Sequence, residues 1–122
     1  MDIDRLIGDF ERKLILQRYS SSSIQNYKSA VRSFLQIAEK RFSHPNELGE
    51  DAIEKYVFWK IKKHNVSISY QRMIVASIDK FYSAVLDRKL NIKHLYPTQK
   101  THSLPKYLTL GEVKRLIDMW IT

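Results

Sequence analysis

The sequence contains no cysteine, which excludes disulfide bonds and thiolate metal sites. No apolar run approaches the roughly 20 residues that a membrane-spanning helix needs. The first thirteen residues are acidic and amphipathic, unlike the basic start and apolar run of a secretory signal. We therefore expect a cytoplasmic protein that has no membrane partner.

Positive charge is abundant and unevenly distributed. The net charge is +8, but eleven Lys or Arg against two Asp give +9 between residues 55 and 106, and seven against one Glu give +6 between residues 12 and 41. The remaining residues therefore sum to −7. Two basic blocks set against acidic segments indicate one basic face, for which a nucleic acid is the leading partner. A basic surface that binds no polyanion is compatible with the same count.

Apolar residues recur at steps of three and four, which predicts an all-α protein with no strand. The expected helices cover residues 2–17, about 20–40, 49–63 and about 67–88. The second should begin at a serine, the third beside Gly49, and the fourth at Ser67 or Ser69. The fourth is apolar nearly all round, so we expect it to be the central helix.

The residues from Asn91 onward differ from the rest of the chain. Two prolines and few periodic apolar positions predict an extended linker, and Thr109 and Glu112 then stand in capping-box register before a new apolar pattern. We therefore divide the chain into a domain at 1–96, a linker at 97–108 and the start of a second, truncated domain at 109–122. Alternatively, the last helix packs back onto the first domain.

Four consecutive serines stand where the second helix is expected to start. Ser20 to Ser23 can cap that helix, and the hydroxyls left over can donate to a phosphate bound at its positive end. Lys28 and Arg32 follow, one turn apart on the polar side of the helix. An ordinary capped surface helix has the same spacing.

Three segments together resemble the N-terminal core-binding domain of tyrosine recombinases, the phage-integrase and Xer-like family. YSSSSIQNYKSAVRSFLQIA (19–38) is similar to the family's second helix, and SYQRMIVASIDKFYSAVL (69–86) to its fourth helix. SLPKYLTLGEVKRLID (103–118) resembles the junction between the linker and the catalytic domain. The three occur in the family's order and cover essentially the whole chain.

The resemblance implies a SAM-like, four-helix domain of two crossed helical hairpins that closes over one side of a DNA half-site. Its partners would be double-stranded DNA and other recombinase protomers, assembled as a tetrameric synapse in the full-length protein. The second and fourth helices would face the major groove, and the linker would follow the DNA backbone. Tyr70 and Asp79 depart from the family's pattern. The positions that match expected DNA contacts are Ser20, Ser23, Lys28, Arg32, Arg72 and Lys106.

No catalytic constellation is present. The family's chemistry needs a tyrosine nucleophile, arginines and a His-x-x-Arg motif, and none of the four histidines here is followed by such an arginine. The histidines are also too scattered for a metal site, so we expect neither metal nor cofactor. The resemblance implies a non-catalytic fragment of a recombinase, with the catalytic residues beyond residue 122. Two alternatives are a self-contained helical DNA-binding regulator and a protein-interaction module with an incidental basic face.

Overall fold

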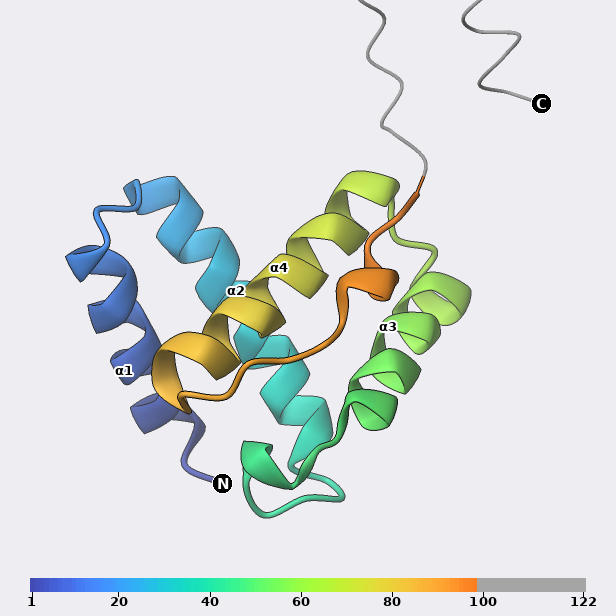
Figure 1. The fold of residues 1–122 in the computed structure, drawn as a ribbon, viewed down its shortest axis with the longest axis horizontal. Coiled ribbons are helices and arrows are strands. Elements are labelled where there is room, and N and C mark those ends of the chain that lie inside the picture. The colour runs from blue at the N-terminus through green and yellow to red at the C-terminus, as the bar shows by residue number, and fades with distance from the viewer. Residues whose placement is uncertain (99–122) are drawn as a thin grey trace, which may run out of the picture.

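The computed structural model describes residues 1–98. The α-helices are α1 (Ile3–Leu16), α2 (Ser21–Ala38), α3 (Glu50–His64) and α4 (Ile68–Val85), with short 3₁₀ helices η1 (Pro45–Glu47) and η2 (Lys93–Leu95). Two antiparallel hairpins, α1–α2 and α3–α4, cross each other (Figure 1). The expected all-α class and its four helices are confirmed. Most of the expected linker (97–108) and all of the expected segment 109–122 lie outside the described residues.

The helices begin where side chains or the backbone can satisfy free N–H groups. The Asp2 carboxylate accepts from the Arg5 N–H at 3.2 Å, and the hydroxyls of Ser20 and Ser67 accept from the N–H groups three residues later. α3 follows Gly49, which has no capping side chain, but acidic residues occupy its first turn. Of the two caps considered for the fourth helix, the structure uses Ser67.

Two helices end earlier than the sequence pattern predicts. α2 ends at Ala38 rather than about residue 40, and α4 ends at Val85 rather than about residue 88. Asp87 has a φ of 51°, in the left-handed region, and the Arg88 N–H donates to the Tyr82 carbonyl at 3.0 Å. This is the usual way to close a helix, and Asp tolerates it better than most residues. The apolar pattern continued past the true end because Leu86 still packs against the core.

The core joins both hairpins through aromatic rings. Phe10 of α1 meets Phe81 of α4 edge-on at a centroid distance of 5.6 Å. Phe34 of α2 packs against Tyr56 of α3 at 4.9 Å and against Tyr82 of α4 at 6.4 Å. α4 contacts all three other α-helices, which confirms its predicted central position.

A strap (residues 86–98) leaves α4 and runs back along it, between α4 and α3 in the view of Figure 1. Its apolar side chains Leu90, Ile92 and Leu95 are buried in the core. The Arg88 guanidinium donates to the Leu48 carbonyl at 2.6 Å and pairs with Glu50 at 3.2 Å. The strap therefore ties the end of α4 to the start of α3.

Candidate nucleic-acid interface

The serine run forms a small cluster of hydroxyls at the start of α2. Ser20 caps the helix, and its Oγ lies 3.0 Å from the Oγ of Ser23 and 3.3 Å from that of Ser22. Ser20 to Ser22 are exposed and Ser23 is half-buried. The cluster thus presents hydroxyl groups to solvent beside the positive end of the α2 dipole.

Lys28 and Arg32 lie on the polar side of α2, as the sequence indicated, but this side faces α1 and both residues form ion pairs with it. The Lys28 Nζ is 2.6 Å from a Glu11 carboxylate oxygen, and an Arg32 guanidinium nitrogen is 2.9 Å from an Asp4 oxygen. Helical periodicity gives the polar side of α2 but not its neighbour. That neighbour is α1, whose two carboxylates are two turns apart. Loss of both cations would therefore also remove two ion pairs between α1 and α2.

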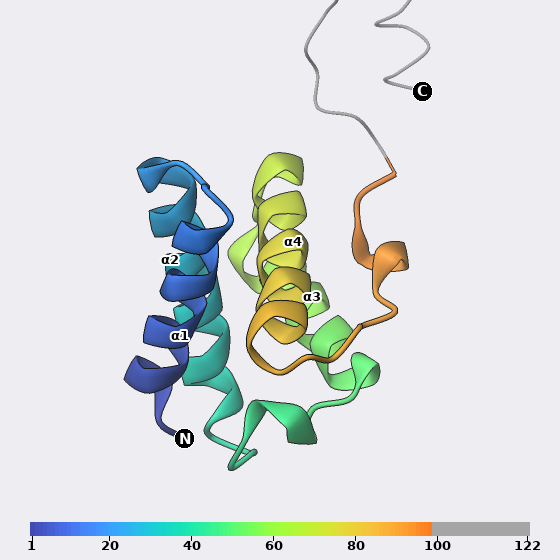
Figure 2. The same ribbon diagram turned by 60° about the vertical axis from the view of Figure 1, so that its left-hand side comes forward.

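The crossed hairpins place the N-termini of α2 and α4 at the same end of the molecule. Both views show the first turns of α2 and α4 at the top and their last turns lower down (Figures 1 and 2). Antiparallel pairing brings the last turns of α1 and α3 to the same end. These last turns carry Lys13 on α1 and Lys62, Lys63 and His64 on α3. Two positive helix ends and several cations thus share one end.

We call this region the basic end and define it by the turns at 17–20 and 65–67 together with the nearby cations Lys13, Arg18, Lys62, Lys63, Arg72 and Lys80. Arg72 is half-buried on the second turn of α4 and has no ion-pair partner among residues 1–98. Lys80 reaches from α4 to the first hairpin, where its Nζ lies 5.0 Å from the centre of the Tyr19 ring. Lys80 thereby contacts the turn between α1 and α2.

Lys62, Lys63 and Lys80 were not among the residues expected from the sequence. A signal for the two α3 residues was present: residues 12–38 and 55–78 contain no Asp or Glu, and each stretch includes the turn of one hairpin. Each carries five Lys or Arg, namely Arg12, Lys13, Arg18, Lys28 and Arg32 in the first and Lys55, Lys60, Lys62, Lys63 and Arg72 in the second. Both turns lie at the upper end of the molecule in Figures 1 and 2. Lys106 lies outside the described residues.

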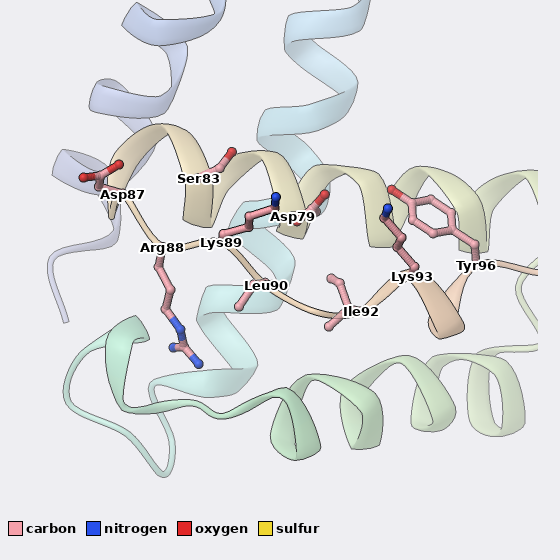
Figure 3. A pocket seen from close by; sticks show the side chains of 9 residues that line it. All are labelled: Asp79, Ser83, Asp87, Arg88, Lys89, Leu90, Ile92, Lys93 and Tyr96. Atoms are coloured by element: carbon pink, nitrogen blue, oxygen red, sulfur yellow. The ribbon is translucent and has the colours of Figure 1, made fainter.

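A cavity of about 340 Å³ lies between α4 and the strap (Figure 3). Asp79 and Asp87 line it together with Lys89 and Lys93, so it carries charges of both signs. Burial raises the pKa of the Tyr96 hydroxyl at its rim, and the nearby Asp79 carboxylate adds to the rise. The carboxylates make this cavity a poorer place for a phosphate than the basic end.

Within residues 1–98, no three His, Asp or Glu side chains are grouped so that they could hold a metal ion. In the same part of the chain, no helix is both long and apolar enough to span a bilayer.

Comparisons with known proteins agree with the motifs and the fold. Residues 6–92 match the model of the phage integrase N-terminal SAM-like domain. The chain is 27% identical over 114 residues to proteins named "Integrase/recombinase" from Escherichia coli and Pseudomonas aeruginosa, covering 93% of this chain and 33% of each relative. The crystal structure of XerA recombinase superposes with a TM-score of 0.68 at 27% identity, covering 96% of this chain and 40% of that one. The chain thus spans about a third of the length of these curated relatives. By its match over residues 6–92, its four-helix fold and its similarity to recombinases, this chain belongs to the phage integrase family, as an N-terminal SAM-like domain.

Proposed function

We propose that this domain binds duplex DNA through the basic end and clamps one side of a recombination half-site. The observation that carries the proposal is the position of the N-termini of α2 and α4 at one end, in two stretches of chain (12–38 and 55–78) that contain Lys and Arg but no Asp or Glu. Helix N-termini and lysine or arginine side chains supply most protein contacts to DNA phosphates. The relatives named as recombinases support the choice of DNA over another polyanion.

Each proposed contact has a role set by its place. Ser20 and Ser23 would donate hydroxyl hydrogens to a phosphate at the start of α2, and Arg72 would reach the duplex from α4. Lys28 and Arg32 would contribute only by exchanging the α1 carboxylates for phosphates. Lys106 remains a proposed backbone contact from the segment that follows the described domain.

The rest of the reaction is assigned to other parts of a longer protein. We place the strand-cleaving chemistry in a catalytic domain outside this chain, and the partners in the synapse would be further recombinase protomers on the same DNA. In this proposal the domain positions DNA for the reaction and requires no metal or cofactor of its own.

The first prediction compares two pairs of exposed lysine or arginine residues. Lys62→Ala/Lys63→Ala removes two cations from the basic end, whereas Lys40→Ala/Arg41→Ala removes two just after the C-terminus of α2, at the other end. Both variants change the net charge equally. We expect the first to weaken duplex binding about tenfold at moderate salt and to reduce the slope of log K against log salt by roughly 2. The control should weaken binding less than about threefold. Fluorescence anisotropy of a labelled duplex, repeated at several salt concentrations, gives both quantities.

Two results would overturn this proposal. Binding that does not change with salt would exclude the phosphate contacts on which it depends. Equal losses in the two variants would mean that overall charge, and not the basic end, attracts the DNA.

A further inference from the structure

α3 carries a large apolar side chain on its outer side. Phe58 is 61% exposed, although its neighbours Tyr56 and Val57 are buried. α3 lies at the right-hand edge of the molecule in Figure 1, and no other described element covers its outer side there. A phenylalanine this exposed at the centre of a helix can mark a site of protein interaction, but a single apolar side chain does not identify the partner.

The partner is inferred from the charged residues on either side of Phe58. Glu54 lies four residues before it and Lys62 four residues after it, so both stand on the same side of the helix as Phe58. Both are exposed, and the Glu54 side chain is 55% exposed. Along the line of side chains through Phe58, the charge is therefore negative at Glu54 and positive at Lys62.

Such a surface is complementary to a second copy of itself. When two α3 helices lie antiparallel about a two-fold axis through Phe58, residues equally far from Phe58 in opposite directions meet. Glu54 of each copy then faces Lys62 of the other, and the two Phe58 rings meet on the axis. Lys55 and Ile61 stand three residues before and after Phe58, so Lys55 of each copy meets Ile61 of the other. The aliphatic part of Lys55 then covers the partly buried Ile61.

We propose that two copies of this chain associate weakly through this surface of α3, defined by Glu54, Lys55, Phe58, Ile61 and Lys62. One phenylalanine and the side chains around it bury less than the roughly 1,200 Å² typical of stable complexes, so we expect a dissociation constant of about 0.1–1 mM. The interface needs no DNA, so the test of this association does not depend on whether the domain binds DNA.

Sedimentation equilibrium of the 122-residue chain without DNA, from about 20 µM to 1 mM, measures the association. The parent chain should show a monomer–dimer equilibrium. Phe58→Ser should raise the dissociation constant at least about tenfold, because it removes the contact on the axis. Lys63→Glu is the matched charge control: it makes the same change as Lys62→Glu one residue along, off the axis, and should leave the constant within about twofold.

Charge reversal tests the antiparallel register directly. Lys62→Glu places two like-charged pairs across the axis, as does Glu54→Lys, and each variant alone should associate at least about fivefold more weakly than the parent. An equimolar mixture of the two should associate again, because each pair across the axis then joins one lysine to one glutamate. Circular dichroism confirms that each variant is folded, since Glu54 also contacts His94 at 3.0 Å. A parent chain that stays monomeric at 1 mM, or a mixture no stronger than its components, would refute the proposed interface.

Discussion

Tyr82 makes a hydrogen bond that the sequence pattern could not predict. Its hydroxyl donates to the Pro45 carbonyl oxygen at 2.6 Å inside the core, and its ring stacks beneath the Arg88 guanidinium at 5.3 Å. The family resemblance placed Tyr82 in the fourth helix, but did not indicate its hydrogen-bond partner 37 residues earlier. A buried tyrosine almost always has such a partner, although its identity depends on the loop geometry.

The second prediction concerns this hydrogen bond. Tyr82→Phe keeps the ring but removes one of two donors to the Pro45 carbonyl, which still accepts from the Leu48 N–H at 3.2 Å, so we expect the free energy of unfolding to fall by about 0.5–1.5 kcal/mol. Tyr70→Phe, which removes an exposed hydroxyl, should change it by less than about 0.5 kcal/mol. Urea unfolding followed by circular dichroism measures both values. A Tyr82→Phe variant as stable as the parent would show that the loop at Pro45 gains nothing from this contact.

The third prediction concerns stability at alkaline pH. Burial raises the pKa of Tyr56 well above its usual value of 10, and the nearby Tyr70 adds to the rise. The unfolded chain therefore loses this proton first, so the stability is fully present below pH 10 and is lost as the pH rises further. Tyr56→Phe should flatten this decline by up to about 1.4 kcal/mol per pH unit, whereas Tyr70→Phe should leave most of it. Thermal unfolding between about pH 8 and 11 tests the difference, and parallel curves for the two variants would contradict it.

Among the secondary-structure elements, α1 is the one whose role the sequence left open. Its apolar stripe predicted a helix packed on one side, which the structure confirms, but nothing in the stripe indicated which polar residues it would meet. Tertiary packing set Asp4 and Glu11 against the two basic residues of α2 that were expected to face DNA. The placement of helices followed from local patterns, whereas the pairing of charges depended on how two helices lie together.

The fourth prediction tests whether these carboxylates compete with DNA. Asp4→Asn/Glu11→Gln frees Lys28 and Arg32, so we expect duplex affinity to rise about three- to tenfold while stability falls by about 0.5–1.5 kcal/mol. Glu39→Gln/Asp87→Asn removes two other exposed carboxylates and serves as the control for net charge. Anisotropy titrations and thermal unfolding provide the two measurements. Equal gains in both variants would remove Lys28 and Arg32 from the proposed contacts.

For the molecule as a whole, sequence patterns predicted the fold well but the binding surface incompletely. The four helices, the central position of α4 and the family all follow from periodicity, caps and motifs. Ser20, Ser23 and Arg72 lie on elements that reach the basic end, although their contacts with DNA remain predictions. Lys62 and Lys63 were missed because helix patterns do not show which helix ends lie at the same end of the molecule.

The strap carries the fifth prediction. Ile92 is 1% exposed and lies outside every helix expected from the sequence. Ile92→Ala should therefore lower the free energy of unfolding by about 2–4 kcal/mol, as in a helix core. Asn91→Ala, at the exposed neighbouring position, should have little effect. Chemical denaturation compares the two, and a tolerated Ile92→Ala would mean that the strap is not part of the cooperative core.

The path of the strap also determines how the domain can be labelled. The described chain begins at the end opposite the first turns of α2 and α4, whereas the strap finishes beside the first turn of α4, where the Gln71 side-chain amide donates to the Leu95 carbonyl at 3.0 Å. A fluorophore or affinity tag joined to Met1 would therefore stand clear of the duplex in the proposed complex. The same group attached just after Thr98 would sit beside it and serve as a proximity reporter.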